Sequence, residues 1–194
     1  MYTTKAKIEN YLLKEIDASF DSQINNWIKA TTREIESITK RVFESVTEER
    51  LFDGNNKRTL PIDDAVEITK LEISNKHYPD SGDYEEEDDY ILLPNNYDKK
   101  GIPATKIHLR SGYFNRGRQN VKINGKWGYS ETVPEDIEFV ATVMTAGIIN
   151  NQLEDNVKDS EKIGDYTVSY KDNQQKQDIE TARSILDSYK KYEL

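Results

Sequence analysis

The sequence predicts an α+β fold: a helical bundle, made of a long N-terminal helix, a central buried helix and a C-terminal helix, with an inserted small antiparallel β module. Apolar residues recur at helical spacing before about residue 46 and after about residue 132, whereas short β-prone runs broken by turn residues lie between. Helices on both sides of an insertion bury their apolar faces by packing on each other. We therefore expect residues 1–46 and 132–194 to form the bundle and residues 47–131 to form the β module.

The first long helix is predicted between Phe20 and Glu44. Its apolar stripe, at steps of three or four residues, consists of Ile24, Ile28, Thr31, Ile35, Ile38 and Val42, with Trp27 beside them. A shorter helix precedes it, indicated by Ile8, Tyr11, Leu12 and Ile16. Asp17 and Ser19 are suitable capping residues for the turn between the two helices.

The β module begins with "RLFDGNNKRTLPI", which predicts a hairpin because Asp53-Gly54 supplies the positive φ that such turns need. Four further candidate strands lie in "AVEITKLEIS", "DYILLP", "TKIHLRS" and "NVKINGKWGY". Within the last of them, Gly125 is expected to form a tight turn. The strands are short and close in sequence, which favours antiparallel pairing.

The helical period returns after Pro134. The segment from Ile137 to Ile149 is apolar on nearly all sides, which predicts a helix at the centre of the bundle. A strand-like "DYTVSY" follows it. The apolar residues of the last helix are Ile179, Ala182, Leu186 and Tyr189.

The stretch "INGKWGYSETVPEDI" joins the β module to the central helix. We expect Trp127 and Tyr129 to pack the end of the last strand against the bundle. Thr132 and Glu135 have the spacing of a capping box, and Pro134 suits the opening turn of a helix. These residues form a predicted structural joint.

Composition excludes several classes of function. A formal charge of -9 and a pI near 4.9 argue against general adhesion to DNA or to an anionic membrane. The absence of cysteine excludes disulfides and thiolate sites. The first residues do not resemble a secretory signal, and the apolar run 139–149 is too short to span a bilayer. We expect a soluble intracellular protein that does not interact with membranes.

No catalytic, metal or cofactor site is predicted. Gly125-Lys126 does not belong to a Walker A loop, because the other required positions hold Asn120 and Trp127. His77 and His108 lack partners at metal-ligand spacing. The many carboxylates leave acid–base pairs possible in principle, but no pair stands out. We expect a protein that is not an enzyme.

Charge is unevenly distributed within the β module. An acidic run, most simply interpreted as a solvated mobile loop, contains Asp83, Glu85, Glu86, Glu87, Asp88 and Asp89. Residues 99–126 contain no Asp or Glu, and their candidate surface cations are Lys106, Arg110, Arg116, Arg118, Lys122 and Lys126. Interleaved with these cations, or directly following them, are the aromatic residues Tyr113, Phe114, Trp127 and Tyr129.

Three interpretations of the basic aromatic stretch 99–129 remain open. It could be a single-stranded nucleic-acid platform. It could be an inter-subunit surface on which the basic face of one copy meets the acidic run of the next, a head-to-tail match that generates a ring. The cations could also be ordinary solvated side chains.

The order of segments resembles a known family. A short helix is followed by "FDSQINNWIKATTREIESITKRVF", by an insertion that opens with "RLFDGNNKRTLPI" and closes with "NVKINGKWGYSETVPEDIEFVATVMTAG", and by "SEKIGDYTVSY" before a last helix. This arrangement resembles the head–tail connector (adaptor, or head completion) proteins of long-tailed bacteriophages. The resemblance extends over almost the whole chain.

The resemblance implies a structural virion protein at the head–tail interface, assembled in the host cytoplasm. About twelve copies would form a ring beneath the portal protein, extend the DNA channel, help to retain the genome and present a platform for the stopper (head-closure) or tail protein. Double-stranded DNA would pass through without sequence-specific binding. The implied portal contacts are Tyr189, Lys190, Lys191, Tyr192 and Leu194. The alternative function is nucleic-acid binding through residues 99–129.

Overall fold

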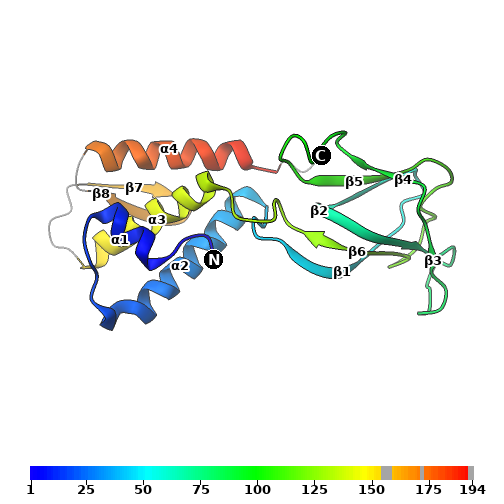
Figure 1. Ribbon diagram of the computed structural model, residues 1–194, viewed down its shortest axis with the longest axis horizontal. Helices are drawn as coiled ribbons and strands as arrows, with labels where there is room; N and C mark the ends of the chain where they lie inside the picture. The colour runs from blue at the N-terminus through cyan, green and yellow to red at the C-terminus, as the bar shows by residue number, and fades with distance from the viewer. Residues whose placement is uncertain (154–158, 171–172, 192–194) are drawn as a thin grey trace. The chain divides into compact units, whose positions relative to one another are not determined.

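The computed structural model describes residues 1–153, 159–170 and 173–191 (Figure 1). The chain divides into two compact units, a helical unit of residues 1–41 and 133–194 and a β unit of residues 42–132. The predicted α+β class is confirmed: the described residues contain four α-helices and a six-stranded antiparallel sheet. A second, two-stranded sheet belongs to the helical unit.

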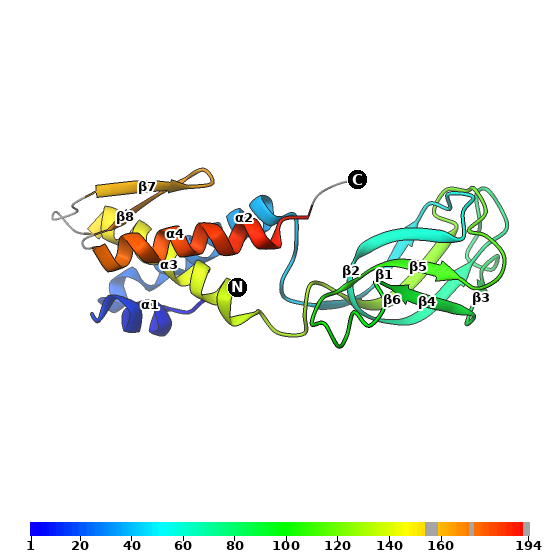
Figure 2. The same ribbon diagram turned by 90° about the horizontal axis from the view of Figure 1, so that it is seen from above.

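The helical unit is built around one buried helix. Its elements are α1 (Lys5–Leu12), the 3-10 helix η1 (Ala18–Phe20), α2 (Asp21–Thr39), α3 (Glu135–Leu153), the hairpin strands β7 (Asp159–Ile163) and β8 (Tyr166–Tyr170), and α4 (Asn173–Tyr189). α3 contacts α1, α2, α4 and β8 (Figure 2). Every residue from 140 to 150 is buried, which confirms the predicted central helix.

The stripe on α2 is buried as predicted at Ile24, Ile28 and Ile35. Its polar member, Thr31, is also buried, and its hydroxyl accepts a hydrogen bond of 3.2 Å from Thr145 of α3. The helix was predicted to extend to Glu44, and this predicted end is wrong.

α2 ends at Thr39, because Lys40 takes a left-handed conformation (φ 56°) and donates its backbone N–H to Glu36. Val42 therefore lies beyond the helix and is 48% exposed.

At the start of α3, the carbonyl of Pro134 accepts a 2.9 Å hydrogen bond from the N–H of Glu138. Pro134 therefore occupies the N-cap position, directly before Glu135, and the prediction that Thr132 would hold this position was wrong.

The β unit contains one sheet in the order β1-β6-β2-β5-β4, with β3 paired to β2. The strands are β1 (Val46–Phe52), β2 (Thr59–Ile73), β3 (Glu85–Glu86), β4 (Tyr90–Leu93), β5 (Ala104–Leu109) and β6 (Val121–Trp127). β2 pairs with β5 through Thr59–Ala65 and with β6 through Ala65–Ile73, and its register shifts at three places. Bulges bend a strand, so β2 carries the sheet around a core of Leu60, Ile62, Ala65, Leu71, Ile107, Leu109, Phe114, Val121, Ile123 and Trp127.

The hairpin predicted around Asp53-Gly54 is wrong. β1 and β2 lie on either side of β6 and do not pair with each other. Gly54 has a different role: a Cβ there would lie 1.9 Å from the carbonyl oxygen of Asn115, so only glycine permits this approach of two loops.

Gly125 is also not in a turn. It lies in the middle of β6, opposite Glu48 of β1 and Ile68 of β2. A Cβ at Gly125 would lie 2.4 Å from the carbonyl oxygen of Glu67, at a bulge in β2. The glycine therefore allows the bulged strand to approach β6 closely.

Candidate interaction surfaces

One buried side chain holds together the loops at one end of the β unit. Asn120 is fully buried; its Oδ1 accepts from the N–H of Gly54 at 2.8 Å, and its Nδ2 donates to the carbonyls of Asn115 at 2.8 Å and Ser74 at 3.2 Å. Three loops that are far apart in sequence therefore share one amide. Polar networks that are satisfied in this way fix a single arrangement of the backbone.

The basic stretch is not free of acidic neighbours in space. Ion pairs within the β unit join Arg110 to Asp89 at 3.6 Å, Arg118 to Asp53 at 2.6 Å, and Lys126 to Glu131 at 3.0 Å and Glu67 at 3.5 Å. Lys122 lies 4.2 Å from the ring centroid of Tyr84. Lys106, on β5, and Arg116 are exposed. Much of the positive charge is therefore neutralised locally.

These ion pairs also shift the pKa values of two of their members. The hydrogen bond from the N–H of Gln119, and then the one from the Arg118 guanidinium, lower the pKa of Asp53 below its ordinary value of 3.8. The hydrogen bond to Glu131 raises the pKa of Lys126.

The acidic run is partly ordered into the sheet. Glu85 and Glu86 form β3 opposite Ile73 and Glu72, and the N–H of Glu87 donates to Leu71 at 2.9 Å. Asp83 pairs with Lys76 at 2.5 Å. Asp88 and Asp89 are exposed. The prediction of a loop is therefore wrong for Glu85 and Glu86, which pair with β2, although their side chains are exposed to solvent as expected.

The aromatic residues of the basic stretch do not form a stacking surface. Phe114 and Trp127 are buried in the core of the β unit, and the Tyr129 ring lies 5.5 Å from that of Phe43. Tyr113 is 56% exposed, with the Arg58 guanidinium 5.5 Å from its ring centroid. A single-strand platform needs successive exposed rings, so this arrangement does not favour the nucleic-acid alternative.

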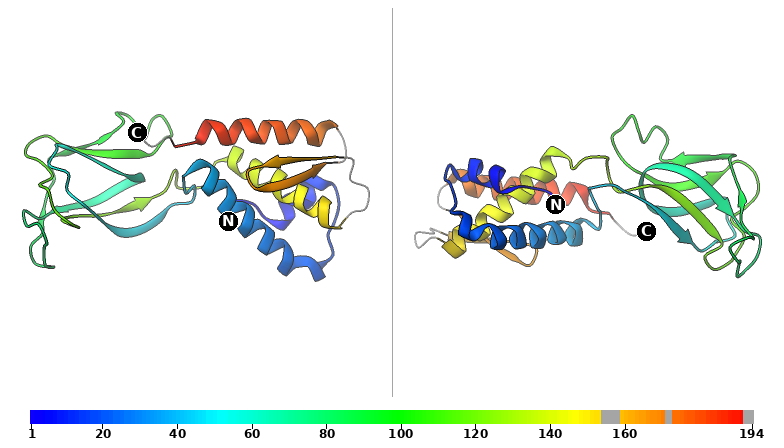
Figure 3. Two further views of the ribbon diagram at one scale, coloured as in Figure 1. Left: turned by 180° about the vertical axis from the view of Figure 1, so that it is seen from behind. Right: turned by 60° about the horizontal axis from the view of Figure 1, so that its bottom comes forward.

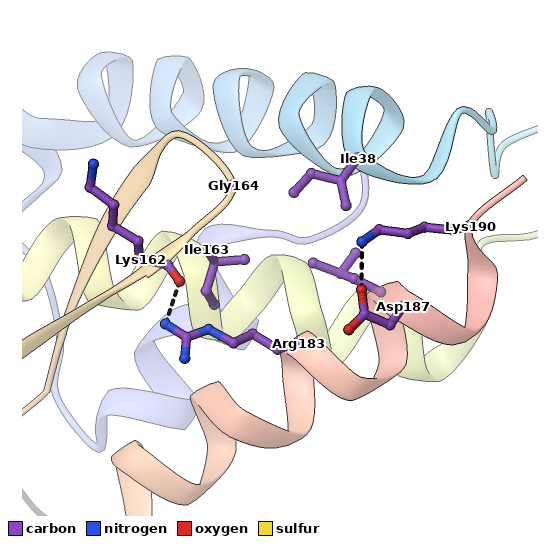
Figure 4. A pocket seen from close by; sticks show the side chains of 8 residues that line it. Ile38, Lys162, Ile163, Gly164, Arg183, Asp187 and Lys190 are labelled. Carbon is purple, nitrogen blue, oxygen red and sulfur yellow. Dashed lines mark hydrogen bonds and ion pairs between the residues drawn. The ribbon is translucent and has the colours of Figure 1, made fainter. Parts of the chain in front are cut away.

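The helical unit contains a pocket of about 430 Å³ between α2, α4 and the β7–β8 turn (Figure 4). Its apolar lining consists of Ile38, Ile163 and Leu186, and its polar and turn residues are Lys162, Gly164, Arg183, Asp187 and Lys190. The Arg183 guanidinium donates to the carbonyl of Lys162, and Lys190 Nζ lies 2.6 Å from Asp187. The pocket thus combines an apolar interior with a rim that carries three cations and one carboxylate.

The hairpin that closes this pocket is fixed to α2. Glu34 Oε1 accepts from the N–H of Asp165 at 2.7 Å, and a Cβ at Gly164 (φ 59°) would lie 1.9 Å from the same oxygen. Glycine is therefore favoured at this turn by its left-handed backbone.

Some of the residues expected to contact the portal hold the end of α4 in place within the helical unit. The Tyr189 hydroxyl donates to Asp136 at 2.9 Å, and its carbonyl accepts from Arg41 Nε at 2.7 Å. The N–H of Lys191 donates to the carbonyl of Thr39 at 2.9 Å. Tyr192 and Leu194 lie outside the described residues. The last turn of α4 is thus tied to the start of α3 and the end of α2, while Lys190 lines the pocket.

One exposed residue was missed by the sequence analysis. Leu13, the residue after α1, is 92% exposed and has a φ of 52°. It is the most exposed large apolar side chain in the described part of the chain. Neighbouring Leu12 fits the apolar period of α1, so the pattern gave no sign that the next leucine would point into solvent.

No group of three or more His, Asp or Glu suited to a metal ion occurs among residues 1–153, 159–170 and 173–191. His108 Nδ1 lies 2.8 Å from the Thr59 hydroxyl within the sheet, and His77 Nδ1 lies 3.2 Å from the Arg116 carbonyl. Over the same residues, no helix is both long enough and apolar enough to cross a membrane.

Comparison with known proteins identifies similarity at the level of fold. Protein-family models and curated protein sequences give no match. Among solved structures, a chain in the neck of an empty gene transfer agent (GTA) particle computed with C6 symmetry has a TM-score of 0.58 and 11% identity, over 97% of this chain and 89% of that chain.

Two further solved structures have a similar fold. A chain in the virion of a native GTA particle has a TM-score of 0.56 and 13% identity, over 92% of this chain and 81% of that chain. A chain in the neck of a native GTA particle computed with C12 symmetry has a TM-score of 0.55 and 12% identity, over 97% of this chain and 88% of that chain. The fold of this protein is therefore that of chains found in the neck and virion of GTA particles.

Proposed function

We propose that this protein is a structural component of the neck of a tailed, phage-like particle, and specifically a head–tail connector that forms a ring beneath the portal. The observation that carries the proposal is the extent of the fold similarity. It spans 97% of this chain and 89% of a GTA neck chain, so both the helical unit and the β unit are included. Fold alone does not determine function, but the order of segments in the sequence independently resembles connector proteins.

The proposed ring contains about twelve copies and surrounds the path of double-stranded DNA. A chain with 36 acidic and 27 basic residues suits such a channel, because phosphates are held by cations and slide past a surface of like charge. In this role the ring extends the channel, helps to retain the packaged genome and offers a platform for the stopper or tail protein. The role is structural rather than enzymatic.

The end of α4 is the proposed portal contact. Tyr189 is bonded to α3 and to Arg41, two residues after α2, and the backbone of Lys191 is bonded to the last residue of α2, so this end has a fixed position in the helical unit. A preorganised surface loses little entropy on binding. Lys190, Lys191, Tyr192 and Leu194 would provide the charged and apolar contacts, whereas Tyr189 acts mainly by holding the turn.

Native mass spectrometry with the portal protein of the same genome tests the proposal. We expect portal complexes that carry about one copy of this chain per portal subunit. The double substitution Lys190→Glu with Lys191→Glu should weaken the complex. A matched control, Lys29→Glu with Lys176→Glu, makes the same change of charge at exposed positions of α2 and α4 and should leave it intact. A protein that stays monomeric and has no affinity for the portal would contradict the proposal, whereas a monomer in isolation would not.

A further inference from the structure

Three loops gather at the end of the β unit that is away from its two connections to the helical unit (Figure 3). These loops, which together form the loop end, are residues 53–58, 74–84 and 110–119. The chain enters and leaves the unit beside the paired residues Val46 and Trp127, whereas the loops adjoin the paired residues Phe52 and Val121. Val46 and Phe52 are six residues apart on β1, which corresponds to about 20 Å at roughly 3.3 Å per residue.

The composition of the loop end is typical of a binding surface. Eighteen of its twenty-seven residues are Gly, Asn, Ser, Tyr or Arg, the residue types that antibody loops use for rigid aromatic contacts, adaptable hydrogen bonds and charged anchors. Turn formation explains Gly, Asn and Ser, but it does not explain tyrosine side chains that are exposed to solvent.

Two tyrosines of the loop end are exposed. Tyr78 is 74% exposed and Tyr113 is 56% exposed, and they are the only aromatic residues among the exposed large hydrophobic side chains of the described chain. The His77 ring lies 4.6 Å from that of Tyr78, and the Arg58 guanidinium lies 5.5 Å from that of Tyr113. Tyrosine and arginine are enriched among the residues that contribute most to protein–protein binding.

The loops are held in one arrangement before any partner binds. The buried Asn120 side chain bonds to residues of all three loops. Asn115 Nδ2 also donates to Asn75 Oδ1 at 2.6 Å, and the N–H of Arg118 donates to the His77 carbonyl at 2.8 Å. A preorganised surface loses less conformational entropy on binding than a mobile one.

The charges of the loop end suit a protein partner better than DNA. Lys57, Arg58 and Arg116 are exposed, and none of them forms an ion pair with another described residue. The other cations of the loops are paired with carboxylates: Arg118 with Asp53, Lys76 with Asp83 and Arg110 with Asp89. A DNA backbone would meet these carboxylates and be repelled by them, whereas a protein can present carboxylates to the three exposed cations and polar groups elsewhere.

We infer that the loop end docks the next protein of the neck, on the side of the ring away from the portal, and that this partner presents carboxylates and hydrogen-bonding groups to it. The inference rests on the proposed connector function, in which the helical unit contacts the portal. That unit is joined to the opposite end of the β unit, which leaves the loop end for another protein.

The symmetry of a ring favours a common partner over a second copy as the occupant. Copies in a ring are related by rotation about one axis, so their loop ends face the same way along that axis. Equivalent loop ends therefore form one composite surface and do not bind each other. Each exposed tyrosine and cation is repeated around that surface, so modest single contacts add up.

Binding of the stopper protein of the same genome to preassembled portal complexes tests this surface. Tyr78→Ala with Tyr113→Ala should weaken binding by about tenfold or more, because two exposed rings are lost. Arg58→Glu with Arg116→Glu should have a similar effect, because like charges would then face the partner's carboxylates. All four side chains are exposed, so melting temperature and assembly on the portal should stay those of the wild type.

The matched control is Lys99→Glu with Lys100→Glu. It makes the same change of charge at exposed positions between β4 and β5, at the end of the β unit where Ala104 pairs with Ala65. This variant should bind the stopper protein like the wild type. Weakened binding in the control equal to that of the arginine variant would show a general effect of charge and would contradict a specific loop surface.

The remaining outcomes separate the inference from the connector function. If the loop variants bind the stopper protein normally, or if wild-type portal complexes do not bind it, the inference is refuted and the connector function stands. Loss of portal assembly in the loop variants at unchanged melting temperature would assign the loops to the ring or portal contact, and loss of salt-sensitive DNA binding would assign them to DNA. Either result refutes the inference. If the wild type forms no portal complex, the connector function fails and the inference fails with it.

Discussion

The guanidinium carbon of Arg50 lies 4.7 Å from the centroid of the Trp127 ring, at the point where edge strand β1 meets β6. The same guanidinium bonds to Glu48 at 2.7 Å and to Asp63 at 2.8 Å. The indole Nε1 of Trp127 donates to the Glu48 carbonyl at 2.9 Å. The tryptophan expected at the joint is thus a core residue of the β unit, with the Arg50 guanidinium over its ring and two carboxylates holding that guanidinium.

Trp127→Ala should therefore destabilise the β unit by about 3–5 kcal/mol, because it removes the largest buried side chain of that core. Arg50→Ala should cost about 0.5–2 kcal/mol through loss of the cation–π contact. Urea unfolding followed by circular dichroism measures both. A Trp127→Ala protein with wild-type stability that no longer binds the portal would instead place this residue in an interface.

Asn120→Ala should loosen the three loops that its side chain joins. The buried N–H of Gly54 would lose its acceptor, which costs about 1–3 kcal/mol. Hydrogen exchange should show faster exchange at Gly54 and Ser74, and thermal unfolding should shift downward. The matched control is Asn95→Ala, at an exposed position of the same unit. Unchanged exchange in the Asn120 variant would show that the loops do not depend on this amide.

Acidification should weaken the link between Asp53 and the loop at residues 118–119. The pKa of Asp53 is lowered in the folded protein, so its contribution to stability is complete above the ordinary value of 3.8 and disappears as the pH falls through the folded pKa. Asp53→Asn should therefore be less stable than the wild type at neutral pH, and the difference should shrink below about pH 4. Denaturant midpoints measured between pH 7 and pH 3 test this, and a difference that is constant with pH would contradict it.

Single-stranded DNA should bind weakly at most. Because Phe114 and Trp127 are buried and Arg118 is paired with Asp53, the stretch 99–129 offers neither a row of rings nor a uniform positive surface. Fluorescence anisotropy with a labelled oligothymidine at low salt should give a flat titration, and Arg116→Glu with Arg118→Glu should not change it. Tight, salt-sensitive binding that this variant abolishes would revive the nucleic-acid function.

The sequence predicted the helical unit better than the β unit. Ile24, Ile28 and Ile35 recur at the period of a helix, and the segment around Met144 is apolar on all sides, so local pattern alone determined their burial. The order of the strands could not be predicted from local pattern in this way. β1 and β6 pair although about 75 residues separate them, and no local signal around Asp53-Gly54 distinguishes a hairpin from a connection that passes over β6.

The surfaces were harder to predict than the fold. Residues 99–126 lack acidic residues in sequence, but folding brings Asp53, Asp89 and Glu131 to their cations. Asn120 entered the sequence analysis only as a residue that does not fit a phosphate loop, because its three partners lie in three separate segments. The pocket beside Lys190 depends on a hairpin turn, an arginine of α4 and an isoleucine of α2, which only the folded chain brings together.

The central claim is that this chain forms a ring in the neck of a phage-like particle. Electron cryomicroscopy of the portal protein of the same genome mixed with this chain tests that claim most directly. We expect a closed ring of about twelve copies, coaxial with the portal, with the end of α4 against the portal and an open central channel. Portal particles that carry no additional density, or density that does not follow the symmetry of the portal, would contradict it.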